Sequence, residues 1–228
     1  MLGFEMENCT FTTSENGEFY VTSHVRSTFE KHGYIVVRNL FQEAEMSNLK
    51  YYFENNIQIQ KNAYGRSDGN DRISKLSLWN YAGDDLSGIV ARYLSKMMKN
   101  LTTSFLDFSF TIFLRSQKVA GTMQTLLGGD EIYHYHSKLM MKEPKTGGAH
   151  VWHQDYGYWY NNGCLFPEMG SVFIPIDKCT KENGCLQVLD QSHKMGRINH
   201  ILEGEQTEAD PDRYILHNKN LILCLLQF

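Results

Sequence analysis

The sequence predicts a mainly β protein with flanking helices (α+β), whose short strands pack as two facing sheets, as in a jelly roll. Residues 170–177, Gly-Ser-Val-Phe-Ile-Pro-Ile-Asp, are typical of an apolar strand. An Asn-Gly pair at 183–184, the strongest hairpin signal in the chain, separates this segment from a second apolar run at 185–189. Upstream, His153 and Asp155 have the two-residue spacing that puts side chains on one face of a strand.

The N-terminal part is expected to contain a helix and a strand. Residues 1–20 are polar and are expected to be loose. Ser23 is a suitable N-cap for a helix that continues to His32, and Gly33 is suited to end it. Residues 34–37 are β-branched or aromatic and are expected to form a strand.

The central part is expected to alternate between helices and strands before it reaches His153. Apolar residues at helical spacing, turn residues and acidic first turns distinguish the segments. In order, we expect a helix, a Gly/Asn/Asp-rich loop, a strand, a helix, a strand and a Pro/Gly turn, at residues 42–53, 64–71, 72–79, 84–97, 132–141 and 143–149.

Length and composition indicate one globular domain. The chain has 228 residues, of which 42% are hydrophobic, so a single domain is expected over residues 21–228. A net charge of −4 does not favour nucleic acid as a partner, and no apolar run is long enough to span a membrane. The chain starts without a signal-peptide pattern, and its five cysteines include no Cys-x-x-Cys pair, so an intracellular, cytoplasmic protein with reduced thiols is expected.

His153 and Asp155 are the candidate metal ligands. On one face of a strand, the imidazole nitrogen and the carboxylate oxygen would converge on a single point. This supplies two ligands of a 2-His-1-carboxylate triad, the arrangement that binds Fe(II) while leaving coordination positions open. The alternative interpretation is a hydrogen-bonded surface pair, because His and Asp occur two residues apart in many chains.

Four segments together resemble the phytanoyl-CoA dioxygenase family. They are the His-Gln-Asp at 153–155, the Glu-Asn-Gly-Cys-Leu at 182–186, the Ser-His-Lys-x-Gly at 192–196 and the opening stretch at 29–41. The resemblance extends over about residues 25–213. It implies a double-stranded β-helix (a cupin-like jelly roll), with Fe(II) as the metal and with 2-oxoglutarate and O2 as cosubstrates. The implied enzyme is a dioxygenase that hydroxylates a small organic or acyl substrate; the oligomeric state is left open.

The resemblance also implies residues that bind the cosubstrate. Lys138 falls on the strand before His153, where a cation would pair with a carboxylate of 2-oxoglutarate; the alternative is an ordinary exposed lysine. Gln154 occupies a position that the family often uses to contact the cosubstrate, although in a regular strand it would face away. Phe173 is expected either to form a wall of the same pocket or to pack in the core.

The third metal ligand is the departure from the family pattern. The family has a later strand-borne His, followed by an Arg for the far carboxylate of 2-oxoglutarate, and neither follows Arg213 here. We therefore expect a domain that lacks its last strands at the C-terminus. His193, His200 and His217 are possible substitutes, of which His217 is nearest in order. The alternative function is a non-catalytic, truncated family member without the distal His and the cosubstrate Arg.

Overall fold

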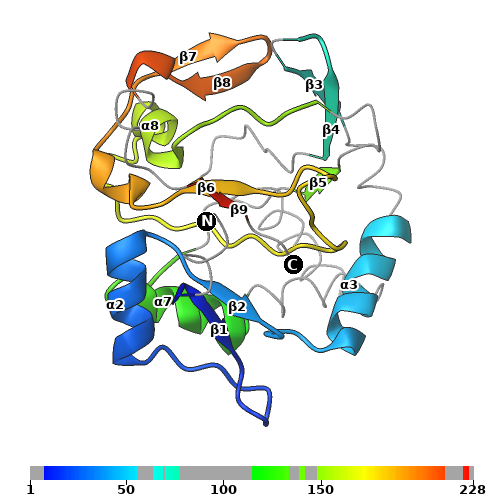
Figure 1. Cartoon of the computed structure of the whole chain (residues 1–228), viewed down its shortest axis with the longest axis vertical. Coiled ribbons are helices and arrows are strands. Elements are labelled where there is room, and N and C mark those ends of the chain that lie inside the picture. Colours follow the sequence, from blue (N-terminus) through cyan, green and yellow to red (C-terminus); the bar gives the residue numbers. More distant parts are fainter. Residues whose placement is uncertain are drawn as a thin grey trace, which may run out of the picture.

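The computed structural model shows helices and short strands in a mixed arrangement (Figure 1). It describes residues 8–55, 64–68, 70–77, 115–133, 139–141, 148–213 and 223–225. The helical segments are α2 (Ser23–His32), α3 (Glu43–Asn55), η1 (Gln117–Gly121), α7 (Thr122–Leu126), α8 (Asp155–Trp159), η2 (Tyr160–Asn162) and η3 (Ser192–Met195).

The described strands form small sheets of two or three strands. They do not close into a barrel within the part of the chain that the structure describes, so a complete jelly roll is not visible there. The parallel pair is β1 (Thr10–Thr12) with β2 (Val36–Arg38); the antiparallel groups are β3 (Tyr64–Ser67), β4 (Ile73–Ser77) and β5 (Leu139–Met141), then β6 (Gln187–Leu189) with β9 (Leu223–Leu225), and β7 (His200–Glu203) with β8 (Gln206–Ala209).

The helix predicted to end at His32 is confirmed, with one change at its start. Thr22 is the N-cap instead of Ser23, since its side chain accepts a hydrogen bond from the N–H of Val25. Gly33 ends the helix in the left-handed conformation with φ of 83°, which a residue without a Cβ adopts without strain.

The last turn of α2 is capped by the turn at residues 190–196. Main-chain carbonyl groups at the end of a helix have no partner within the helix, and here three of them accept hydrogen bonds from this distant segment. The donor and acceptor pairs are His193 Nε2 to Glu30 O (2.9 Å), Lys194 Nζ to Lys31 O (2.8 Å) and Gln191 N to His32 O (2.9 Å). The imidazole of His193 therefore caps the end of α2, and the Ser-His-Lys turn has a structural role there.

The loop predicted at residues 64–71 is instead a strand followed by a tight turn. The carboxylate of Asp68 accepts hydrogen bonds from the main-chain N–H groups of Asn70 and Arg72, both at 2.9 Å. This turn reverses the chain between β3 and β4, which then pair. The Asn and Asp residues thus contribute to the turn of a hairpin, a role for which their side chains are well suited.

The strand predicted at residues 170–177 does not form, and neither does its hairpin with 185–189. Val172 and Phe173 are 45% and 41% exposed, and β6 pairs with β9 instead. The Asn-Gly pair still makes a turn, with φ of 76° at Gly184 and a hydrogen bond from the N–H of Cys185 to the carbonyl of Thr180. The turn chemistry was predicted correctly, but a strand also needs a neighbour, and 170–177 has none among the described residues.

Three further expectations lie wholly or largely outside the described residues. They are the helix at 84–97, the turn at 143–149 and most of the strand at 132–141, of which β5 is described. In Figure 1, α8 and the β7–β8 hairpin lie together at one end of the molecule. The His-Gln-Asp motif leads into α8, and its Gln154 contacts His200, the first residue of β7.

Candidate functional site

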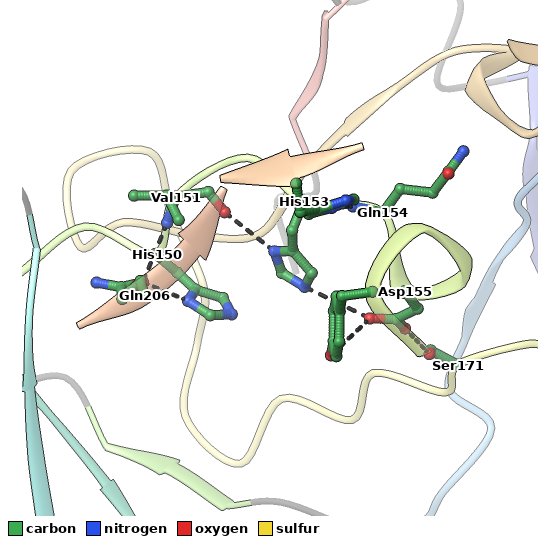
Figure 2. A network of polar contacts seen from close by, with 9 residues as sticks. His150, Val151, His153, Gln154, Asp155, Ser171 and Gln206 are labelled. Carbon is green, nitrogen blue, oxygen red and sulfur yellow. Dashed lines mark hydrogen bonds and ion pairs between the residues drawn. The ribbon is translucent and has the colours of Figure 1, made fainter. Parts of the chain in front are cut away.

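The chain approaches His153 along a segment that Gln206 holds in place (Figure 2). Gln206, the first residue of β8, is 2% exposed. Its Oε1 accepts hydrogen bonds from His150 Nδ1 (2.9 Å) and from the N–H of Val151 (3.3 Å). Its Nε2 donates to the carbonyl groups of Ala149 (2.9 Å) and Ser67 (3.4 Å). One buried amide therefore substitutes for a strand partner along residues 149–151.

Asp68 fixes the start of the same segment. Its Oδ2 accepts a hydrogen bond from the N–H of Ala149 at 3.0 Å, in addition to the two bonds that form the β3–β4 turn. The hydrogen bond from the Arg72 main chain, followed by those from Ala149 and Asn70, holds the pKa of the Asp68 carboxyl below its ordinary value. The ionised carboxylate is thus the form that the folded chain prefers.

Acid is expected to remove this contribution of Asp68. Because the pKa is lowered on folding, the stabilisation is complete above the ordinary carboxyl pKa of about 4 and is lost as the pH falls through the lower folded value. Asp68→Asn, which places an NH2 group against an N–H donor, should therefore reduce the free energy of unfolding at neutral pH and differ less from wild type in acid. Urea unfolding of both proteins across the pH range measures this difference in free energy of unfolding. A difference that grows in acid would contradict the stabilising role of the Asp68 carboxylate.

His153 and Asp155 face each other, as the sequence predicted. His153 Nε2 lies 3.5 Å from Asp155 Oδ1, and the two side chains are 21% and 34% exposed. The local conformation differs from the expected strand: Gln154 is extended, with φ of −119° and ψ of 119°, and Asp155 begins α8. The two side chains converge because the chain turns from an extended segment into a helix between them.

Hydrogen bonds fix the orientation of both side chains. His153 Nδ1 donates to the carbonyl of Val151 at 3.0 Å, so in the neutral imidazole the lone pair is on Nε2, the atom that faces Asp155. Asp155 Oδ2 accepts from Ser171 Oγ at 2.7 Å, and Oδ1 accepts from the hydroxyl of Tyr158 at 3.3 Å. A metal-binding His held by a main-chain carbonyl and a carboxylate held by a hydroxyl are typical supports of a metal site.

Ser171→Ala is expected to weaken metal binding at this pair. Without the hydroxyl, Asp155 Oδ2 loses its 2.7 Å donor, so the carboxylate is held less firmly in its orientation toward His153. Loss of such a support lowers metal affinity by roughly 10–100-fold. Titration with Co(II), followed by its visible absorption, measures the affinity. Ser171→Thr keeps the hydroxyl and serves as the control; equal affinity in the Ala and wild-type proteins would contradict this role.

The structure describes two of the three residues that we predicted to contact the cosubstrate. The amide of Gln154 bonds to Gly196 O (2.8 Å, through Nε2) and to the N–H of Ile198 (3.0 Å, through Oε1). Phe173 is 41% exposed. Lys138 lies outside the described residues, as does His217. The cosubstrate roles of Lys138, Gln154 and Phe173 therefore stay predictions.

The donor atoms present fit two positions of a metal ion. Adjacent ligand atoms in an octahedral site are about 3 Å apart when each lies about 2.1 Å from the metal. His153 Nε2 and Asp155 Oδ1 are 3.5 Å apart, so a small movement toward each other would let both bind the same metal ion. Over the part of the chain that the structure describes, no third His, Cys, Asp or Glu joins this pair in a metal-binding group. His200, a possible substitute, lies close by, and burial lowers the pKa of its imidazole.

Sequence reasoning missed Ser171, Gln206 and Asp68. Each acts through a hydrogen bond to a residue distant in the chain, and none belongs to a recognisable motif. The Asx turn of Asp68 was detectable as a Gly/Asn/Asp-rich segment, but its contact with Ala149, 81 residues away, was not.

The oriented His–Asp pair presents two donors of the kind found in 2-His-1-carboxylate metal sites. The family model for phytanoyl-CoA dioxygenase (PhyH) matches residues 29–218. The chain therefore belongs to the phytanoyl-CoA dioxygenase family, whose fold is of the cupin or jelly-roll type. No solved structure gives a significant match.

Relatives include hydroxylases and dioxygenases. An L-proline trans-4-hydroxylase from Streptomyces griseoviridis is 36% identical over 86 residues, 37% of this chain and 32% of the relative. A phytanoyl-CoA dioxygenase domain-containing protein 1 homolog from Caenorhabditis briggsae is 24% identical over 190 residues, 75% and 65% of the two chains. A probable alpha-ketoglutarate-dependent hypophosphite dioxygenase from Stutzerimonas stutzeri is 24% identical over 163 residues, 71% and 50%.

These matches support a dioxygenase by family resemblance. The chain spans between about a third and two thirds of the length of these curated relatives. Among the described helices, none is both long and apolar enough to cross a membrane.

Proposed function

We propose that this chain is an Fe(II)/2-oxoglutarate-dependent dioxygenase that hydroxylates a small organic or acyl substrate. The proposal includes a single double-stranded β-helix domain over residues 21–228 and an intracellular, cytoplasmic location. The observation that carries it is the convergence of His153 Nε2 and Asp155 Oδ1 at 3.5 Å, with each side chain oriented by its own hydrogen bond. Membership of the family supports the reaction type.

His153 and Asp155 are the residues that would hold the metal. The neutral imidazole offers its Nε2 lone pair because Nδ1 carries the proton that Val151 O accepts. Asp155 offers Oδ1, the oxygen that faces His153, while Ser171 engages Oδ2 and the longer bond from Tyr158 reaches Oδ1. Bound Fe(II), with 2-oxoglutarate and O2, supplies the oxidation that places a hydroxyl group on a substrate carbon. The role of the protein would be to fix these two donor atoms and to orient the substrate toward the metal.

Tyr158 of α8 lies beside this pair and is in contact with a further aromatic residue of the same helix. The ring of Tyr158 lies 6.0 Å from that of His153, centroid to centroid, and 4.9 Å from Trp159. The hydroxyl of Tyr156 donates to the carbonyl of Leu165 at 3.1 Å, which attaches the following loop to α8. This aromatic surface is suited to exclude water and to contact an organic substrate.

The test is an anaerobic titration of the chain with Fe(II) and 2-oxoglutarate. A weak metal-to-ligand charge-transfer band in the visible region is expected with wild type, and it should vanish in Asp155→Ala. Succinate formation after admission of O2 then reports turnover. Absence of the band with a folded wild-type protein would reject the enzyme and favour the second candidate, a non-catalytic family member. That candidate is supported by the lack of a third ligand among the described residues.

A further inference from the structure

We propose that His200 is a positioning residue of the candidate metal centre, whose imidazole holds the peptide between the two ligands. His200 begins β7. Its Nε2 accepts a hydrogen bond from the main-chain N–H of Gln154 at 2.9 Å, and its Nδ1 donates to the carbonyl of Ile198 at 2.9 Å. The inference rests on the proposed function, because it concerns how His153 and Asp155 are presented.

The two hydrogen bonds assign the tautomer of His200. A carbonyl oxygen only accepts, so Nδ1 carries the proton; Nε2 must then keep its lone pair to accept from Gln154. That lone pair is directed at a peptide N–H. In this arrangement His200 is therefore not available as a third ligand, although the sequence placed it among the candidates. It acts on the ligands through the main chain.

Both the main chain and the side chain of Gln154 bond to the segment at residues 196–200. Its main-chain N–H bonds to His200, and its side-chain amide bonds to Gly196 O and to the N–H of Ile198. The φ and ψ angles of Gln154 determine whether the side chains on either side of it converge. A segment more than 40 residues away thus fixes the conformation on which the 3.5 Å approach of His153 to Asp155 depends.

Gly157 provides an independent reason to assign this role to His200. A Cβ added at Gly157 would lie 2.1 Å from His200 Cε1 and 2.5 Å from the carbonyl oxygen of Ile198, closer than real atoms approach. The absence of a side chain at this point of α8 is what allows the imidazole to reach Gln154. The imidazole ring also lies 5.8 Å, centroid to centroid, from the ring of Tyr158.

Two substitutions at position 200 separate the two nitrogen atoms of the imidazole. His200→Gln places an oxygen near the position of Nε2 and can still accept from Gln154. His200→Asn places an NH2 group near the position of Nδ1 and retains only the bond to Ile198. We expect Co(II) affinity to fall by roughly 10–100-fold in the Asn variant, as for other supports of a metal site, and to stay close to wild type in the Gln variant.

A second measurement does not depend on metal. In the metal-free protein, amide hydrogen exchange at Gln154 should accelerate in His200→Asn and remain protected in His200→Gln, because only the latter keeps the acceptor. Gly157→Ala changes no polar group but displaces the imidazole, so it should reproduce both effects of His200→Asn. Circular dichroism identifies which variants are folded, and the comparison is made among those.

The outcomes distinguish this inference from the proposed function. Wild-type Co(II) affinity and Gln154 protection in folded His200→Asn or Gly157→Ala would overturn the inference and leave the metal centre standing. Equal loss in the Gln and Asn variants would also overturn it, because packing of the ring would then be what matters. A folded wild-type protein that binds no Co(II) would reject the proposed function, and the inference with it.

Discussion

Replacing His153 or Asp155 by alanine is expected to abolish 2-oxoglutarate turnover without unfolding the chain. Each residue supplies one of the few protein atoms available to the metal, and both are partly exposed, so the fold depends little on them. Changing a residue that merely supports a ligand costs about 10–100-fold in affinity or activity, and removing a ligand itself should cost more. Succinate production under saturating Fe(II) and 2-oxoglutarate is the measurement.

The controls for this experiment come from the same region. Glu168→Ala removes an exposed carboxylate from the loop that follows η2 and should retain turnover. Asp155→Asn keeps an oxygen that can accept from Ser171 but removes the negative charge, so it separates the shape of the site from its charge. Wild-type succinate production in either alanine variant would refute the metal role of that residue.

The part of the site that the sequence predicted is the part that depends on local geometry. His153 and Asp155 are two residues apart, and the extended conformation of Gln154 between them is the part of this geometry that the spacing predicts. The prediction succeeded although Asp155 begins a helix instead of continuing a strand. The helix α2 was predicted for the same reason, because its caps lie within a few residues of its ends.

The features that were missed depend on contacts between distant segments. A hydrogen bond joins His200 to Gln154 across 46 residues, and another joins Gln206 to His150 across 56. Residues 170–177 have the composition of a strand, but strand formation depends on a partner, and β6 pairs with β9 instead. A single sequence does not show which distant segments pair, and these pairings override the local preference of a segment for strand structure.

Gln206→Met is expected to be the most destabilising single substitution on the described face of the site. Methionine is close to glutamine in volume but bonds to none of its partners. The N–H of Val151, the Nδ1–H of His150 and the carbonyl of Ala149, all in part-buried hydrogen bonds, would each lose the acceptor or donor seen here. Since an unsatisfied buried polar group costs about 1–3 kcal/mol, a loss of roughly 3–5 kcal/mol in the free energy of unfolding is expected.

Urea unfolding at neutral pH, followed by tryptophan fluorescence, measures this loss. Thr207→Met introduces the same side chain at the neighbouring, exposed position of β8 and should stay within about 0.5 kcal/mol of wild type. The effect should reach the metal site as well, because residue 151 provides the carbonyl that orients His153. Co(II) affinity should therefore fall in folded Gln206→Met under conditions in which Thr207→Met binds normally. A loss of stability no greater than that of Thr207→Met would mean that the Gln206 amide does not support this segment.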